Sequence, residues 1–401
     1  MGALAVGFLY QFYYDGGDTF AYHTHGSRPL WEAMVESPAK GFRLLFQNGE
    51  YGPGIWETAN KIWYWNDPQS FFVIRVAAIL DLFTFSSYSG TAVLFGVIAF
   101  TGGWMFFITF YKNYPDFHFW IAVSILFIPS VIFWGSGIFK DTLTLSALGV
   151  ATYTFHRVFI EKQIKFFPFL LMLLSLLVIF SIKKYILLCF LPALLLWWYA
   201  SQLSKISSFI LRILLAPMVG VVALFLAYYA VIKVGEDDPR YNISRLAKTA
   251  QVTAYDIRYG WGARTGEGSG YTLGELDGSW QSMLKLAPQA INITLFRPYF
   301  WEVINPLMFF SAIEGFILLL LTLHLVWRVR LKIFSYLQKP AILFCFVFAI
   351  VFAFAVGVST FNFGTLSRYK IPMMPYFLLA LAMVHHYWNR DKKLAEFEAT
   401  E

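Results

Sequence analysis

Charged residues are scarce in this chain. Asp, Glu, Lys and Arg make up 14% of its 401 residues, against roughly 25% in ordinary soluble domains. Hydrophobic residues make up 58%, and the mean hydropathy is +0.58. A soluble protein with this balance could not cover its surface with polar groups, and a disordered one would be far less apolar. The apolar runs are continuous, which argues against a transmembrane β-barrel. The composition predicts an all-α, polytopic helical membrane protein.

Cysteines and familiar enzyme motifs are also scarce. The two cysteines, Cys189 and Cys345, lie in apolar runs and form neither a disulfide framework nor a metal-binding spacing. The sequence has no P-loop and no G-x-G-x-x-G, H-E-x-x-H or G-x-S-x-G motif, so cytoplasmic nucleotide chemistry has no visible site. The net charge of +7 comes from scattered basic residues that gather at the ends of apolar runs. It indicates membrane topology and anionic lipid or phosphate partners rather than nucleic acid.

Apolar runs of about 17–25 residues predict membrane spans, and about ten spans are expected on this rule. They lie at 1–14, 90–111, 117–134, 141–160, 166–182, 185–200, 208–232, 306–327, 340–360 and 369–388. The first run is short for a span and lacks the features of a cleavable signal peptide, which leaves open a start upstream of Met1.

Lys and Arg in the short loops predict the orientation of the spans. One set of span ends carries most of them and is expected to be cytoplasmic. An even number of spans then places both termini inside, with the tail 389–401, and two long polar segments outside, 15–89 and 234–305. Tryptophans in the first of these segments suit interfacial helices at the outer face. We expect one integral domain, residues 1–401, in the cytoplasmic membrane.

Two aspartates follow the first run. Asp15 and Asp18 are separated by two glycines, and Tyr22 and His23 come soon after them. Two carboxylates on a loose turn can share a divalent metal ion such as Mg²⁺ or Mn²⁺, or one can act as general base toward a hydroxyl acceptor. The tyrosine and histidine add hydrogen-bonding groups for a substrate. Alternatively, the aspartates cap the next helix and solvate a loop.

Basic residues occupy two tight outer turns. Lys140 follows the glycine-containing turn 135–137 and begins the next run, where free backbone N–H groups and the ammonium favour an anion. Asp141 is expected to orient or partly neutralise Lys140. Lys183 and Lys184 interrupt apolar sequence in another turn and suit a polyprenyl phosphate. Alternatively, Lys140 extends from a tight hairpin to lipid head groups, and Lys183 and Lys184 occupy a plain turn between spans.

Two later segments bring further basic residues to the outer side. Arg297 and Glu302 can pair, or Arg297 can hold a phosphate while the neighbouring aromatic rings suit a sugar. A structural ion pair in an interfacial anchor is the alternative. Arg368 and Tyr369 stand before the last predicted span, and Arg368 is the basic residue that we favour most for substrate binding.

Three stretches carry a family resemblance. They are D-G-G-D-T-F-A-Y at 15–22, F-W-G-S-G-I-F-K-D at 133–141 and R-Y-K-I-P-M-M-P at 368–375. Together with a first span, an outer acidic loop and many further spans, they resemble the GT-C superfamily of integral membrane glycosyltransferases, which use polyprenyl-phosphate-linked sugars. The resemblance covers most of the chain by layout and only these stretches by sequence.

The resemblance implies that Asp18 or Asp15 acts as base toward the acceptor, and that Lys140 and Arg368 contact the donor phosphate. It implies sugar transfer outside the membrane, in glycan or polysaccharide assembly, from a polyprenyl-phosphate-linked donor to a glycan, lipid or protein acceptor. The basic outer face also suits a Wzy-like polysaccharide polymerase or an O-antigen ligase. A lipid-linked-glycan flippase or other transporter, and a non-catalytic subunit of a membrane complex, are alternatives of different classes.

Overall fold

The structure, a computed structural model, describes residues 1–206, 245–261 and 269–398, together with Tyr229, Ile232 and Asn242. These residues are 79% helical and contain no β-strand. An isolated antiparallel bridge joins Gly270 to Asn362. The all-α prediction is confirmed for this part of the chain.

Among the described residues, four helical segments are long and apolar enough to cross a membrane: Tyr88–Tyr111, Lys184–Leu203, Pro306–Leu337 and Pro340–Thr360. They are compatible with a membrane protein. The expected count of about ten spans is not confirmed.

Several predicted spans differ from the helices that the structure contains. The predicted span 208–232 lies outside the described residues. The predicted span 117–134 consists of two short helices, which Phe127 and Ile128 separate. The last predicted span, 369–388, corresponds to a helix that begins at Met374 and continues to Glu398, so most of the charged tail is helical.

The chain divides into two compact units, each built from separate stretches of sequence. The first contains Met1–Thr109, Pro129–Thr154 and Ile164–Lys184, and the second contains Phe110–Ile128, Phe155–Gln163 and Tyr185–Glu401. The prediction of a single integral membrane domain is not tested by this division, and each unit is described by itself.

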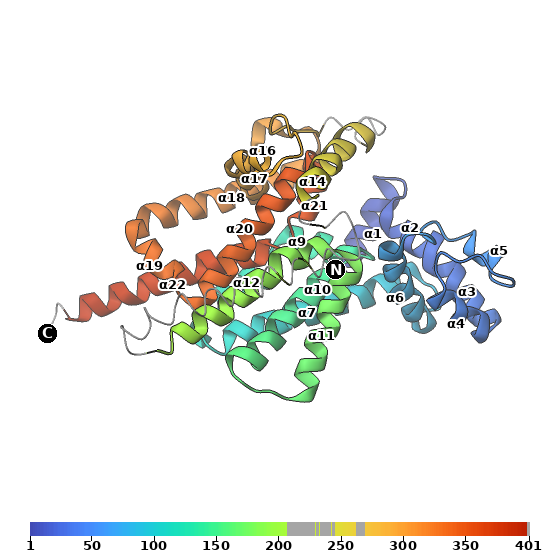
Figure 1. The fold of residues 1–401 in the computed structure, drawn as a ribbon, viewed down its shortest axis with the longest axis horizontal. Coiled ribbons are helices and arrows are strands. Elements are labelled where there is room, and N and C mark those ends of the chain that lie inside the picture. Colours follow the sequence, from blue (N-terminus) through green and yellow to red (C-terminus); the bar gives the residue numbers. More distant parts are fainter. Residues whose placement is uncertain (207–228, 230–231, 233–241, 243–244, 262–268, 399–401) are drawn as a thin grey trace. The chain divides into compact units, whose positions relative to one another are not determined.

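The first unit is built mainly from helices of residues 1–182. They are α1 (Gly2–Phe12), α2 (Asp18–Tyr22), η1 (His23–Ser27), α3 (Arg28–Glu36), α4 (Pro38–Phe46), α5 (Trp56–Ala59), α6 (Pro68–Thr84), α7 (Tyr88–Tyr111), α9 (Pro129–Trp134), α10 (Lys140–Phe155) and α11 (Phe166–Ile182). Helix α6 packs against η1, α3 and α11, and α1 packs against α9 (Figure 1).

Local sequence sets where helices of this unit begin. Ser37 accepts a hydrogen bond from the backbone N–H of Lys40 at 3.4 Å, and Pro38 follows it at the start of α4. Asp67 caps α6 in the same way through the N–H of Gln69, again before a proline. A polar N-cap followed by proline satisfies a free N–H and presets the first helical φ.

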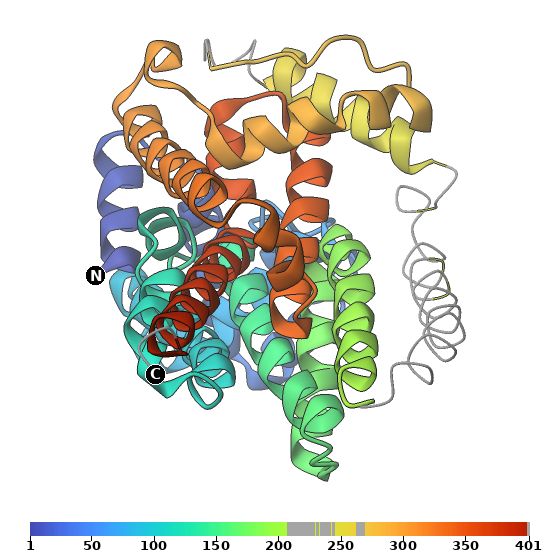
Figure 2. The same cartoon turned by 90° about the vertical axis from the view of Figure 1, so that its left-hand side faces the viewer.

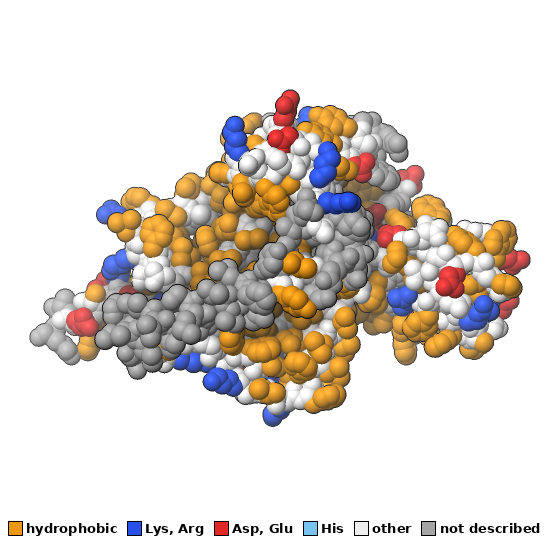
Figure 3. All heavy atoms as spheres, in the orientation of Figure 1, with side chains coloured by type: hydrophobic (Ala, Val, Ile, Leu, Met, Phe, Trp, Pro, Cys, Tyr) orange, Lys and Arg blue, Asp and Glu red, His pale blue; other side chains and the backbone are white. Residues whose placement is uncertain are grey.

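Helix α11 presents an apolar face outward. Phe166 and Phe167 are 81% and 70% exposed, and Leu177 is 57% exposed. Figure 3 shows hydrophobic side chains gathered over this helix. In water such a continuous apolar face would be costly, so it suits contact with lipid.

The second unit contains the later helices. They are η2 (Pro115–Phe117), α8 (His118–Leu126), η3 (His156–Ile160), α12 (Lys184–Leu203), α14 (Leu246–Tyr255), η5 (Asp256–Trp261), α16 (Trp280–Lys285), α17 (Ala287–Phe296), η6 (Phe300–Glu302), α18 (Pro306–Val329), η7 (Arg330–Lys332), α19 (Ile333–Leu337), α20 (Pro340–Thr360), α21 (Phe363–Tyr369) and α22 (Met374–Glu398). Helix α20 packs against α14, α17 and α22, and α22 also packs against α8 (Figure 2).

Candidate functional site

The acidic turn after α1 brings Asp18 to the start of α2. Gly16 and Gly17 have φ of 122° and 116°, a backbone conformation that glycine adopts without strain. Asp18 is half-buried as the first residue of α2, whereas Asp15 is exposed in the turn before it. The two predicted carboxylates therefore have different surroundings, and Asp18 is the one that a helix holds in place.

Lys140 begins α10 beside two acidic side chains. The preceding turn is held by the hydroxyl of Thr142, which donates to the carbonyl of Gly137 at 2.6 Å. Nζ of Lys140 donates to Oδ2 of Asp67 at 3.4 Å. Asp18 also attracts the Lys140 ammonium, and Lys183 repels it. These groups therefore lie within electrostatic range of one another.

The contact between Lys140 and Asp67 is loose and partly solvated. The side chains are 19% and 45% exposed. Burial raises the pKa of Asp67, but the hydrogen bond from Ser70 and the charge of Lys140 hold it below its ordinary value. Exposed ion pairs contribute little stability, so an anionic ligand can replace Asp67 at Lys140 at small cost.

Lys183 forms a buried ion pair with Asp141. Nζ of Lys183 donates to Oδ1 of Asp141, and the side chains are 9% and 0% exposed. The sequence led us to expect Asp141 beside Lys140, its neighbour in the chain. Adjacent side chains on a helix point in different directions, and Asp141 reaches the lysine that follows α11 instead. Lys184 places its ammonium over the ring of Phe180, 4.5 Å from the centroid.

We call Asp18, Asp67, Lys140, Asp141 and Lys183 the charge cluster. It contains three carboxylates and two ammonium groups. Because the Lys183 ammonium is buried against Asp141, only Lys140 combines partial exposure with a replaceable partner. Within the cluster, Lys140 is thus the better candidate for a phosphate contact, and Asp18 the better candidate for a base.

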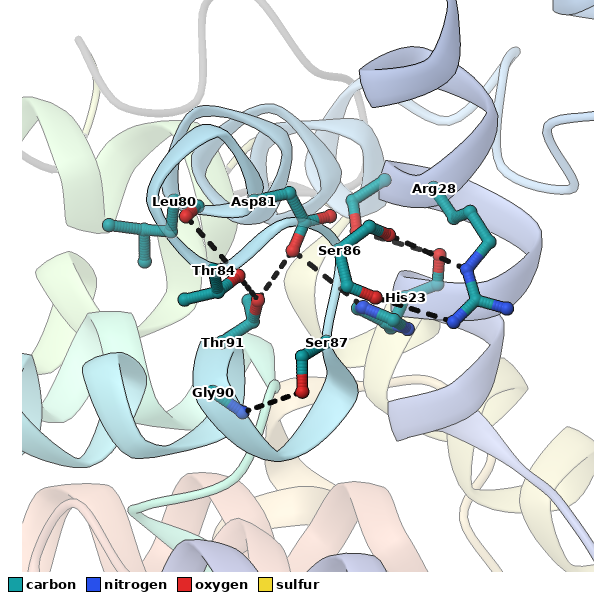
Figure 4. Close-up of polar contacts among 10 residues, drawn as sticks. His23, Arg28, Leu80, Asp81, Thr84, Ser86, Ser87, Gly90 and Thr91 are labelled. Carbon is teal, nitrogen blue, oxygen red and sulfur yellow. Dashed lines mark hydrogen bonds and ion pairs between the residues drawn. The ribbon is translucent and has the colours of Figure 1, made fainter.

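Tyr22 and His23 point into the protein. Tyr22 is 3% exposed and packs against Tyr64, with ring centroids 5.2 Å apart. His23 is 0% exposed and faces Asp81 on α6 (Figure 4). Because both side chains are buried, neither is placed to contact a substrate as predicted.

Arg297 and Glu302 form a structural pair in the second unit. Nε of Arg297 donates to Oε2 of Glu302 at 2.9 Å, Nη2 donates to Oε1, and the N–H of Tyr299 also donates to the carboxylate. The hydrogen bond to Glu302 raises the pKa of Arg297. Burial raises the pKa of Glu302, but these hydrogen bonds hold it below its ordinary value. The alternative of an anchoring ion pair is thus favoured over a free phosphate-binding arginine.

Arg368 and Tyr369 end α21, also in the second unit, and both are half-buried. Asn362 caps this helix by accepting from the N–H of Thr365 at 3.0 Å and donates to the hydroxyl of Ser269 at 3.1 Å. The next residue, Lys370, is 1% exposed, and its ammonium has no hydrogen-bond partner within the described ranges.

The predicted residues thus fall into two sets. The first unit holds Asp15, Asp18, Tyr22, His23, Lys140, Lys183 and Lys184, and the second holds Arg297, Glu302, Arg368 and Tyr369. Sequence reasoning missed Asp67 and Asp81. Asp81 could have been found, because a single aspartate in the apolar run 76–85 is costly unless it has a partner.

The donors for the predicted Mg²⁺ or Mn²⁺ are not assembled. In the part of the chain that the structure describes, no group of three or more His, Cys, Asp or Glu side chains could hold a metal ion. Asp15 is exposed and Asp18 lies in the charge cluster. The residues do not form a fitting metal site, and no step below depends on a metal.

Comparisons with known proteins identify no relative: no family model, curated protein or solved structure matches the chain. The chemistry open to this chain therefore follows from the charge cluster and its surroundings.

Proposed function

We propose that this chain is an integral membrane glycosyltransferase that transfers a sugar from a polyprenyl-phosphate-linked donor to an acceptor hydroxyl. The observation that carries the proposal is the placement of Asp18 and Lys140 within electrostatic range of each other in one unit. A carboxylate and a cation within electrostatic range of each other supply what the two ends of a glycosyl transfer require: a proton acceptor and a site for leaving-group charge.

In the proposed reaction the acceptor oxygen forms a bond to the anomeric carbon, and Asp18 takes the hydroxyl proton. The bond between that carbon and the carrier phosphate breaks, and its electron pair stays on the phosphate oxygen. The Lys140 ammonium stabilises the new negative charge after leaving Asp67. The predicted phosphate contact at Arg368 belongs to the second unit and is tested separately.

We further propose that the chain lies in the cytoplasmic membrane, with both termini inside and the charge cluster at the outer face. The four apolar helical segments and the outward face of α11 support a membrane location, and the charge bias of the short loops supports the orientation.

The test uses the purified full-length protein in lipid nanodiscs with a panel of polyprenyl-phosphate sugars. Asp18→Asn should lower transfer by about 10²–10⁴-fold, the usual contribution of a general base, while carrier binding stays. Asp15→Asn is the matched control, because asparagine tolerates the positive φ of 51° at this position. It should keep most activity. Lys140→Gln should weaken both carrier binding and transfer.

Two results would overturn this assignment. Transfer that survives in Asp18→Asn but fails in Arg368→Ala would favour an arginine-centred polymerase or ligase. Neither binding nor transfer with any carrier would favour transport or a role in a membrane complex.

A further inference from the structure

His23 and Asp81 face each other in the first unit (Figure 4). Both side chains are 0% exposed. Nε2 of His23 lies 3.6 Å from Oδ1 of Asp81. Both ring nitrogens of His23 and Oδ2 of Asp81 lack a hydrogen-bond partner among the described residues. Buried polar groups are nearly always hydrogen-bonded, so this pair requires a physical explanation.

Two threonine hydroxyls form a chain that ends at Asp81. Thr91 donates its single hydroxyl proton to Oδ1 of Asp81 at 2.5 Å. The hydroxyls of Thr84 and Thr91 are 2.7 Å apart, and the Thr84 hydroxyl also donates to the carbonyl of Leu80 at 3.4 Å. Of the two, only Thr91 donates to Asp81 itself (Figure 4). Hydrogen bonds donated to a carboxyl group favour its ionised form.

An ionised carboxylate at this depth needs a positive charge beside it. Arg28 is directed elsewhere, because its Nε and Nη2 donate to the hydroxyl and carbonyl of Ser86 at 3.4 and 3.3 Å. Tyr88 contributes an uncharged ring, edge-on to His23 with centroids 5.5 Å apart. Other titratable groups on the elements around η1 are Asp18 and Tyr22 on α2, His25 on η1, Glu32 and Glu36 on α3, and Arg75 on α6. The group that faces Asp81 is His23.

We propose that His23 and Asp81 form a buried proton-binding site, in which the bound proton makes His23 a cation and the resulting ion pair fastens η1 to α6 and α7. Helix α2 also contacts α7: the hydroxyls of Thr19 and Tyr88 are 2.8 Å apart, and the ring of Phe20 stacks on that of Tyr88 with centroids 4.5 Å apart. Helix α2 continues directly into η1, a π-helical turn of the kind that recurs at functional sites. Loss of the proton leaves Asp81 without a counter-charge and releases this segment.

One consequence rests on the proposed function. Asp18 begins α2, so release of η1 would move the proposed base, and sugar transfer would fall as the pH rises. The binding of the proton itself does not depend on any activity.

The site is tested by nitrogen NMR of the intact protein in nanodiscs, labelled with ¹⁵N-histidine. The chain has seven histidines, and the His23 signals are assigned by their loss in His23→Gln. At neutral pH we expect both ring nitrogens of His23 to carry protons. Asp81→Asn should remove one of these protons, and Thr91→Val should reduce the protonated fraction because it removes a donor to Asp81.

Thr101→Val is the matched control, since Thr101 is an exposed residue of α7 whose hydroxyl donates to its own helix at Val97. It should leave the His23 signals unchanged. A neutral His23 in the unmodified protein, or an Asp81→Asn variant whose His23 stays doubly protonated, would overturn the proposal. If the NMR result holds but no sugar is transferred at any pH, the proton site stands and the proposed function fails.

Discussion

The ion pair between Lys183 and Asp141 allows a sharp prediction about stability. Replacing Lys183 with methionine keeps most of the side-chain volume but leaves the Asp141 carboxylate, which is 0% exposed, without this partner. Two unit charges 4 Å apart attract each other by about 4 kcal/mol at an effective dielectric constant of about 20. Removing one member of a buried pair typically costs about 3–5 kcal/mol. We expect Lys183→Met to lower the free energy of unfolding by that amount.

The double variant separates loss of the pair from loss of packing. Lys183→Met combined with Asp141→Leu removes both charges, and such replacements are often neutral or stabilising. It should therefore be far more stable than Lys183→Met alone. Lys140→Met is the matched control, because its partner Asp67 is 45% exposed. It should cost no more than about 1 kcal/mol.

The assay is detergent-induced unfolding of the unmodified protein, the two single variants and the double variant at low and high salt. The cost of Lys183→Met should not change with salt, because buried charges are poorly screened. The buried pair would not stabilise the fold as calculated if Lys183→Met lowered the free energy of unfolding no more than Lys140→Met does. The same would follow if the double variant were no more stable than Lys183→Met alone.

Three further predictions concern other contacts. The pKa of Asp67 is held below its ordinary 3.8, so its charge stabilises the folded protein above that pH, and this contribution is lost as the pH falls through the lowered value. Asp67→Asn should therefore flatten the fall in melting temperature below about pH 4. An unchanged dependence of melting temperature on pH in this range would contradict the prediction. Arg297→Lys should lower the free energy of unfolding by about 1.5–3 kcal/mol, because lysine cannot reproduce the two-point hydrogen bonding to Glu302. Lys40→Ala, which removes the exposed pair with Glu36, is the control and should be nearly neutral when both variants are unfolded by heat. Gly149→Ala should destabilise the packing of α10 on α7 by about 1–3 kcal/mol, since its methyl group would meet the backbone of Gly102. Gly96→Ala on α7 should be tolerated because the nearest atom to its new methyl group, Cβ of Ala3, would lie 3.6 Å away. Equal melting temperatures for these two variants would argue against the close approach of Gly149 to Gly102.

Apolar runs were enough to predict helices and the positions of several charges within them. The run from 166 to 182 predicts α11, whose bounds are Phe166–Ile182. Lys140 was expected where a run begins and is the first residue of α10. These features are local, because hydrophobic run length and turn residues act over a few neighbours.

The pairing of charges could not be predicted in the same way. Asp141 and Lys183 are separated by 41 intervening residues and meet only when α10 and α11 are both in place. The break at Phe127 and Ile128 likewise lies inside a run that is apolar throughout. Run length predicts that a helix forms, but it does not predict which side of the helix faces a given neighbour or where tertiary packing interrupts it.

The separation of Asp141 from Lys183 has a consequence for biosynthesis. At about 5–20 residues per second, a ribosome makes Lys183 about 2–8 s after Asp141, since the two are 42 positions apart. During that interval the nascent α10 carries a carboxylate whose lysine partner has not yet been made. Folding of α10 should therefore be provisional until α11 has been made, so the two helices are expected to fold as a pair.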